Sequence, residues 1–398
     1  MDDASATYEW LLRPLSPDEF ERCYYQERFC VVHRDAPGYY GDLLSVGDLD
    51  RVLGTHGIRH PDLQIVRFEE EIPASEYTSG EEVVDPLRAA KLFAEGATLV
   101  FSHLHARVPA LARFCSALSQ VLSSKMQANI YFTPPNAQGF KPHWDTHDVF
   151  VLQVSGSKRW MIYETRFRLP LRGQKFDPKK DPAPSAPIDE FELRAGDLLY
   201  IPRGVMHAAR STAEPSLHVT AGLMAFTWAD FFLQGVAEAA LADESLRENL
   251  PLGFARAGFA APERARLVRE KAARFVDRLA SEPPFPFFST EVVSFNRPCL
   301  ENLLGQMAQL ERITLATTVR RRPDAVWDLR ETDAGCVVRC FGKEIQLPGF
   351  LSPALRFAVD GAEFSVGDMP DCVDGPGKVT LVRRLVKEGL FECLESGT

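Results

Sequence analysis

The chain has 398 residues, of which 45% are hydrophobic and 25% are charged. This length and composition are typical of a globular protein with two or three domains and a sizeable core. The formal net charge of -10 disfavours nonspecific binding to nucleic acid or to anionic membranes, whereas it suits a basic protein or peptide partner.

Targeting signals and cysteine usage both bear on where the protein works. The acidic start, Met1-Asp2-Asp3-Ala4, lacks the basic residues and apolar core of a signal peptide. No apolar run is long enough to span a bilayer. The eight cysteines include no CxxC pair, so a zinc site is not expected. We therefore expect a cytoplasmic protein with free thiols and no membrane partner.

Four segments differ in pattern along the chain. Residues 1–95 show mixed helical and loop patterns, and residues 96–226 change to short apolar or alternating runs separated by Gly and Pro, which favours β-strands. Residues 227–290 are rich in Ala, Glu, Arg and Leu and are predicted to be helical. Residues 291–398 are predicted to form a small α+β module, whose last helix lies near 379–388 and is ended by a glycine.

The predicted strands indicate the fold class. The clearest runs are 128–133, 149–154, 198–201 and 216–220, with turn residues between them. Several short strands of this kind suit a barrel or a double-sheet jelly roll. We therefore predict an α+β protein in which a jelly roll is followed by helices and a smaller C-terminal module.

The strongest chemical signal is a histidine and an aspartate two residues apart, His143 and Asp145, with His207 far downstream. Residues two apart in an extended segment point the same way, so His143 and Asp145 can reach one point. His207 follows a turn, a strand and a proline, an order that returns it to the same end of a barrel. Two imidazoles and one carboxylate on one face of a metal leave open positions, as in non-haem Fe(II) oxygenases.

A bare His-x-Asp pattern is common and usually binds no metal. The added His207, at the end of a strand that begins with Gly196-Asp197, raises the weight of the metal-site hypothesis considerably. The neighbouring His147 fits a turn or a position beside the ligands better than a fourth ligand.

A predicted hairpin after the metal pair carries Lys158. If its side chain points into the barrel it needs an anion, because an unpaired buried charge is costly. It could then hold the distal carboxylate of 2-oxoglutarate. The alternative is a hairpin lysine that extends to solvent.

Two further strands have polar faces that would suit the same cavity. One carries Asn129, Tyr131 and Thr133, and the other carries Ser216, His218 and Thr220. Among them, Tyr131, Asn129, Ser216 and Thr220 are candidate contacts for a bound co-substrate or substrate. The opposite alternative, that both faces are solvated, is nearly as well supported by the sequence alone.

The segment 129–145, continued by Lys158-Arg159-Trp160, resembles the JmjC-type ribosomal oxygenases, and residues 196–207 and 216–220 match as well. These are cupin-fold Fe(II)- and 2-oxoglutarate-dependent hydroxylases of ribosomal-protein side chains. The resemblance implies a double-stranded β-helix with His143, Asp145 and His207 as iron ligands and Lys158 as the anchor of 2-oxoglutarate. It places Asn129 and Tyr131 on the cavity wall.

Outside the barrel the resemblance implies a helical dimerisation region at 227–290 and a winged-helix-like domain at 291–398. From residue 297 onward there are 13 Lys and Arg against 15 Asp and Glu, so direct nucleic-acid binding is not expected of that domain. Trp144 and Thr146 depart from the family pattern, which often has Tyr and a second Asp, and this puts the substrate in doubt.

The expected function is hydroxylation of a side chain, with a ribosomal protein as the first candidate substrate. Three alternatives stay open: a 2-oxoglutarate oxygenase that tailors a peptide or small molecule, a metal-dependent cupin that does not use 2-oxoglutarate, and a non-catalytic binding protein. The helical region is expected to form a homodimer, or else to pack on the barrel of its own chain.

Overall fold

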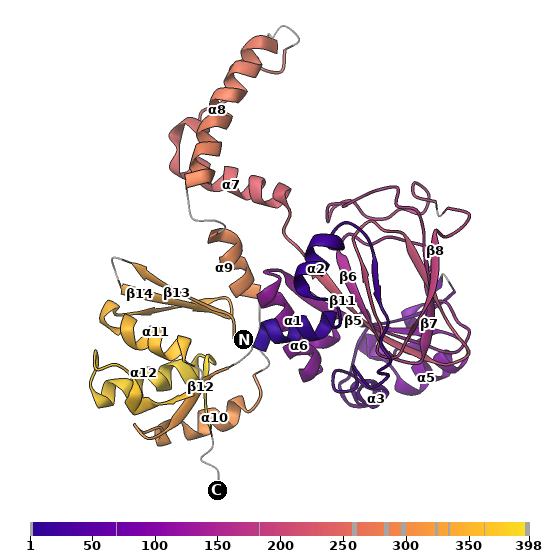
Figure 1. Cartoon of the computed structure of the whole chain (residues 1–398), viewed down its shortest axis with the longest axis horizontal. Coiled ribbons are helices and arrows are strands. Elements are labelled where there is room, and N and C mark those ends of the chain that lie inside the picture. The colour runs from indigo at the N-terminus through magenta and orange to yellow at the C-terminus, as the bar shows by residue number, and fades with distance from the viewer. Residues whose placement is uncertain are drawn as a thin grey trace. The chain divides into compact units, whose positions relative to one another are not determined.

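The structure, a computed structural model, describes residues 3–68, 70–182, 184–256, 261–281, 286–295, 300–322, 325–332, 335–361 and 363–394. The chain divides into two compact units (Figure 1). The first contains Met1–Ala225 together with Val292–Thr398, and the second is Phe226–Glu291. The four-part division predicted from the sequence is finer than these two units and stays a prediction.

Two antiparallel sheets form a jelly roll in the first unit. The larger sheet has the strand order β1-β9-β6-β11-β5-β4-β2-β3, and the smaller has the order β10-β7-β8. The strands are β1 Cys30–Val32, β2 Leu63–Arg67, β3 Glu70–Glu71, β4 Thr98–Phe101, β5 Lys125–Thr133, β6 Asp148–Ser155, β7 Ser157–Ile162, β8 Asp189–Arg194, β9 Leu198–Ile201, β10 His207–Ser211 and β11 Ser216–Met224. In Figure 1, β5, β6 and β11 lie on one side of the barrel and β7 and β8 on the other. The predicted jelly-roll fold is confirmed.

Strand β6 is buried on both faces, which explains its nearly unbroken apolar run. Val149 and Val151 pack with Trp160 in the cluster between the two sheets. Phe150 and Leu152, on the other face of β6, pack in the larger core with the N-terminal helices. Those helices are α1 Asp3–Leu12, α2 Pro17–Cys23, α3 Val46–Thr55, α4 Ala74–Tyr77, α5 Pro86–Ala94 and α6 Pro109–Val121.

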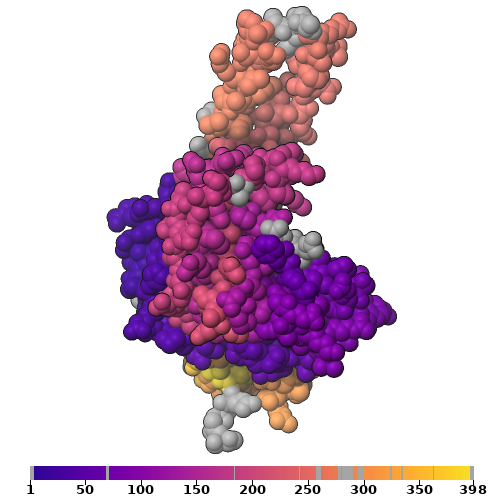
Figure 2. All heavy atoms as spheres, turned by 90° about the vertical axis from the view of Figure 1, so that its right-hand side faces the viewer, coloured from indigo at the N-terminus to yellow at the C-terminus, as the bar shows by residue number. Residues whose placement is uncertain are grey.

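The N-terminal flank contributes strands as well as helices. β1 pairs with β9, and β2 pairs with β4, so both extend the large sheet. The sequence prediction of helix and loop for residues 1–95 missed these strands, because runs of three and five residues carry little periodicity. Figure 2 shows the violet surface of this flank beside the magenta surface of the jelly roll.

The C-terminal part of the first unit has its own core. Two three-stranded sheets, β16-β12-β17 and β13-β14-β15, pack with the helices α10, α11 and α12 among its described residues. The elements are α10 Leu303–Gln309, β12 Thr318–Arg321, β13 Trp327–Thr332, β14 Gly335–Cys340, β15 Lys343–Leu347, α11 Ser352–Asp360, β16 Glu363–Ser365, α12 Gly375–Lys387 and β17 Phe391–Cys393. The predicted last helix is confirmed as α12, which begins earlier than expected. The winged-helix description stays a prediction.

The second unit is built on α7 Trp228–Ala242 and α8 Ala261–Ser281, and α9 Pro286–Phe295 follows across the boundary to the first unit. Within it, Gly235 lets α7 approach α8: a Cβ on Gly235 would lie 2.7 Å from Leu279 Cδ2. Across the described part of the chain, no helix combines the length and apolarity needed to cross a bilayer.

Candidate active site

The backbone places the two candidate histidine ligands side by side. His143 lies in the segment before β6, and His207 is the first residue of β10. They form an isolated antiparallel bridge, in which His143 N donates to His207 O at 3.0 Å and His207 N donates to His143 O at 2.8 Å. Asp145 is tied to the same segment, since Gly204 N donates to its carbonyl at 2.9 Å.

The three side chains converge. Their ligand atoms all lie within 4.8 Å of one another. His207 Nε2 is 3.8 Å from Asp145 Oδ2, and the His143 and His207 ring centroids are 4.6 Å apart. The structure therefore brings together the triad that the sequence singled out, and the donor set of two imidazoles and one carboxylate fits Fe(II).

Hydrogen bonds to backbone carbonyls orient both imidazole rings. His143 Nδ1 lies 2.8 Å from Lys141 O, and His207 Nδ1 lies 3.0 Å from Val205 O. A carbonyl only accepts, so each Nδ1 carries the proton and each Nε2 keeps its lone pair for a metal. In both cases the carbonyl belongs to the residue two positions earlier in the chain.

The electrostatics of the triad favour the ligand forms. Burial, together with the nearby His143, lowers the pKa of His207 to about 4, so the ring is neutral at physiological pH. Burial acts to raise the pKa of Asp145, but His143 and His207 outweigh it and hold the pKa below its ordinary value. A neutral imidazole and an ionised carboxylate are the states that bind a metal.

A cavity of about 620 Å³, including its open mouth, leads from this triad into the barrel. Its wall contains Thr98, Tyr131, Gly139, Phe140, His143, Asp145, Val149, Val151, Lys158, Trp160, His207, Ala209, His218 and Thr220. The candidate metal triad and the predicted co-substrate lysine thus share one cavity.

Lys158 points inward rather than to solvent. It is 4% exposed, and its Nζ donates to Thr133 Oγ1 at 3.1 Å. Burial lowers the pKa of Lys158 to about 7. Among the described residues no carboxylate forms an ion pair with it. The alternative of a lysine extended to solvent is therefore wrong, and the cavity contains an amine that needs an anion in its charged form.

Two polar atoms of the cavity wall lack a hydrogen-bond partner in the described part of the structure. They are Trp160 Nε1 and His218 Nδ1, both buried. Buried polar atoms are nearly always hydrogen-bonded, so such atoms in a cavity indicate a polar ligand. Together with Lys158 they fit an acidic co-substrate such as 2-oxoglutarate.

The other predicted contacts divide into two groups. Tyr131 and Thr220 line the cavity. Asn129 and Ser216 do not: Asn129 Oδ1 accepts from His103 N at 3.0 Å, and Ser216 Oγ accepts from Gln153 Nε2 at 2.9 Å. Their predicted contact with a ligand stays a prediction.

The prediction did not select several residues of the wall. His218, on the polar face of β11, stacks on Tyr131 with ring centroids 4.9 Å apart, and it was noted but not chosen. Thr98 and Phe140 come from other segments, and nothing in their sequence context indicates a cavity. His147 is outside the triad, and its ring lies against Gly222.

Trp144, which departs from the family pattern, is 5% exposed. Its ring stacks with Phe167 and meets Phe176 edge-on, with both ring centroids 5.8 Å away. Phe176 in turn lies 6.5 Å from the ring of His143. Trp144 therefore anchors the long connection between β7 and β8 beside the triad.

Comparison with known proteins adds a family and several relatives. A family model for the JmjC domain matches residues 102–231. Ribosomal oxygenase 1 of Rattus norvegicus is 34% identical over 275 residues, which are 63% of this chain and 43% of that protein. The bifunctional lysine-specific demethylase and histidyl-hydroxylase NO66 of Aedes aegypti is 28% identical over 338 residues, which are 81% of this chain and 53% of that protein. The chain thus spans about half the length of these curated relatives.

Solved structures of YcfD, a ribosomal oxygenase from Escherichia coli, share the fold. One matches with a TM-score of 0.57 at 17% identity, over 96% of this chain and 98% of that one. Another, in complex with cobalt and 2-oxoglutarate, matches with a TM-score of 0.54 at 17% identity, over 96% of this chain and 99% of that one.

Proposed function

We propose that the chain, whose residues 102–231 match the JmjC domain and which is similar to ribosomal oxygenases, is an Fe(II)- and 2-oxoglutarate-dependent oxygenase of that family. It hydroxylates a side chain, and the substrate is a ribosomal protein. The observation that carries the proposal is one cavity that contains both the His-Asp-His cluster and a buried lysine with no carboxylate partner among the described residues.

Each residue of the site has a defined task in this proposal. His143, Asp145 and His207 hold the iron through Nε2, a carboxylate oxygen and Nε2. Lys158 pairs with the distal carboxylate of 2-oxoglutarate, which directs the keto acid end toward the metal. When bound, iron and 2-oxoglutarate supply the activation of dioxygen and the oxidising power for hydroxylation. The apolar wall formed by Val149 and Val151 keeps water from that region.

The buried lysine also bears on the alternatives. A metal-dependent cupin that does not use 2-oxoglutarate has no need of a cation that is 4% exposed and lacks a described carboxylate partner. A peptide- or small-molecule-tailoring oxygenase would use the same cavity, so it stays the second candidate. The names of the relatives and the acidic net charge of -10 favour a basic ribosomal protein as the substrate, rather than a biosynthetic peptide or small molecule.

We also propose that the chain is a homodimer formed through α7, working in the cytoplasm. Helix α7 has large apolar side chains that lie open to solvent in the single chain, among them Trp228 at 68% exposed and Leu233 at 73%. Exposed apolar surface of this kind on one helix is typical of an interface.

The test is succinate formation by purified protein that has been loaded anaerobically with Fe(II) and given 2-oxoglutarate and oxygen, with and without ribosomal protein fractions. Turnover that His143→Ala abolishes, together with a mass increase of 16 Da on a ribosomal protein, is the expected result. Turnover without any ribosomal product would favour the tailoring oxygenase. No 2-oxoglutarate consumption under any condition would refute the oxygenase.

A further inference from the structure

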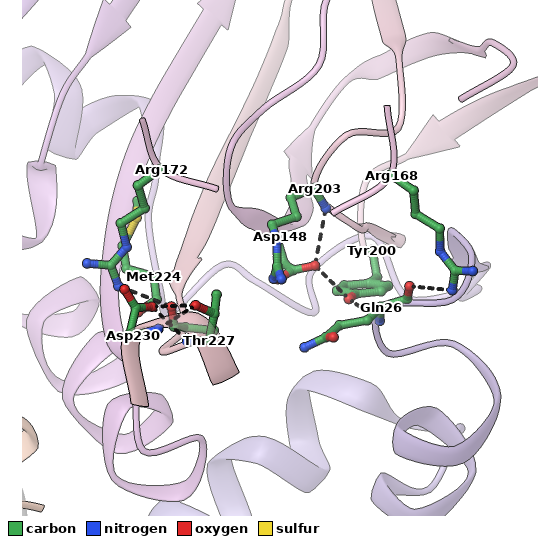
Figure 3. A network of polar contacts seen from close by, with 10 residues as sticks. Gln26, Asp148, Arg168, Arg172, Tyr200, Arg203, Met224, Thr227 and Asp230 are labelled. Carbon is green, nitrogen blue, oxygen red and sulfur yellow. Dashed lines mark hydrogen bonds and ion pairs between the residues drawn. The ribbon is translucent and has the colours of Figure 1, made fainter. Parts of the chain in front are cut away.

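A buried ion pair lies behind the metal triad, outside the cavity wall. Asp148 is 0% exposed, and its Oδ2 accepts from Arg203 Nη1 at 3.2 Å. Its Oδ1 accepts from Arg203 N at 3.2 Å and from the Tyr200 hydroxyl at 3.1 Å. The Tyr200 oxygen accepts in turn from Gln26 N at 3.0 Å. Figure 3 shows this network, with Asp148 between Arg203 and Tyr200.

The ion pair joins the two segments that carry the metal ligands. Asp148 is the first residue of β6, three positions after the ligand Asp145. Arg203 follows the end of β9, four positions before the ligand His207. The next residue after Arg203, Gly204, donates its N–H to the carbonyl of Asp145 at 2.9 Å. A charged side-chain link therefore runs parallel to the backbone links between the ligand segments.

Stability alone does not account for charges at this position. Taking two charges out of water is costly before their attraction is counted, and well-packed apolar residues of similar size often stabilise a core equally well. Arg203 Nε, moreover, is buried without a partner among the described residues. What an ion pair with three hydrogen bonds on one carboxylate does supply is a fixed distance and register between two segments.

We propose that Asp148 and Arg203 are positioning residues, which set the separation of the two ligand-bearing segments and thereby the affinity of the triad for its metal. Tyr200 extends the same restraint to the segment that precedes β1. This inference rests on the proposed metal site and assigns to that site two residues that touch neither metal nor co-substrate.

The test uses the full chain and Co(II) alone as the probe. The dissociation constant is measured by calorimetry, and the visible absorption of bound Co(II) reports the coordination geometry. For Asp148→Asn we expect a dissociation constant about 10- to 100-fold higher than that of the unaltered chain, as for other residues that orient metal ligands, and an altered absorption spectrum. Tyr200→Phe should shift both readouts in the same direction by less.

A matched control lies at the other end of β9. Asp197, 2% exposed, immediately precedes β9 and accepts from Arg34 N at 2.7 Å and Arg194 N at 2.9 Å. Asp197→Asn should lower the melting temperature of the barrel without changing the Co(II) constant or spectrum. The control thus shows the effect of losing a buried carboxylate alone, and any further effect of Asp148→Asn on Co(II) binding comes from the position of the metal ligands.

The outcomes are distinct. Asp148→Asn that is folded by circular dichroism and binds Co(II) within about twofold of the unaltered chain, with the same spectrum, overturns the positioning role. If Asp148→Asn does not fold, Tyr200→Phe and Arg203→Lys decide by the same criterion. No Co(II) binding by the unaltered chain overturns the metal site itself, and this inference with it.

Discussion

His143 and His207 exchange both of their backbone hydrogen bonds, at 3.0 and 2.8 Å, across a bridge that belongs to no regular strand pair. Residues paired in this way hold their Cα atoms about 5.5 Å apart. The main-chain hydrogen bonds therefore hold the two histidines next to each other, and the carbonyls of Lys141 and Val205 orient their rings.

The bridge leads to the first prediction. His143→Ala should abolish metal binding and turnover but keep the fold, because the bridge uses only main-chain atoms. Metal content after dialysis and circular dichroism measure the two effects. His147→Ala is the matched control: this histidine lies outside the triad, and the variant should retain the metal. Metal retained by His143→Ala would contradict the assigned ligand set.

The second prediction follows from the pKa of Lys158, which burial lowers to about 7. A carboxylate binds the protonated lysine, so above pH 7 the lysine must take up a proton when 2-oxoglutarate binds. The dissociation constant should therefore rise by up to about tenfold per pH unit above 7. Calorimetry from pH 6.5 to 8.5, with Co(II) present, measures it.

The control for this pH dependence is Lys158→Arg, whose guanidinium stays charged throughout. Its constant should change little over the same range, and an equally steep profile in this variant would assign the dependence to another group. The folding stability of the chain without 2-oxoglutarate depends on pH in the opposite direction: it increases, whereas the affinity for 2-oxoglutarate decreases. The unfolded chain binds a proton that the folded chain does not between pH 7 and the ordinary value of 10.5, so this group adds stability as the pH rises through that window.

The third prediction concerns Gly204, which precedes His207 in the ligand segment. Its φ is +86°, and a Cβ there would lie 2.2 Å from Phe167 O. Gly204→Ala should destabilise the barrel by about 1–3 kcal/mol and weaken metal binding. Urea unfolding and Co(II) titration measure these effects. Gly54→Ala, in α3 with no atom within 4 Å of the added Cβ, should instead stabilise by about 0.5–1 kcal/mol.

Some residues of the site could be predicted because the pattern that indicates them lies within a few neighbouring residues of the sequence. His143 and Asp145 are two apart in an extended segment. The hairpin made Lys158 a candidate, but only the structure shows that its side chain points into the barrel. Thr98 could not be predicted, because it enters the cavity only through the pairing of β4 with β5, a contact between segments distant in the chain. Turn residues in the sequence mark where a strand ends, but they do not show which strand it pairs with or in which register.

The polar faces of β5 and β11 show a second limit of the sequence. Alternation places Asn129 and Ser216 correctly on faces that hold cavity residues, but it does not say which polar groups are already bonded. Asn129 bonds to His103 N, and Ser216 bonds to Gln153. Those partners come from other strands and loops, so only the structure shows that the two side chains are engaged.

The last prediction concerns the second unit. Leu233 on α7 is 73% exposed, and Leu87 on α5 in the first unit is 74% exposed. If α7 forms a homodimer interface, Leu233→Asp places a charge in an apolar contact and should convert the dimer to a monomer at micromolar concentration. Leu87→Asp, equal in exposure, should stay dimeric. Analytical ultracentrifugation distinguishes the two masses. A monomeric unaltered chain, or a Leu233→Asp variant that remains a dimer, would show that α7 does not form the interface.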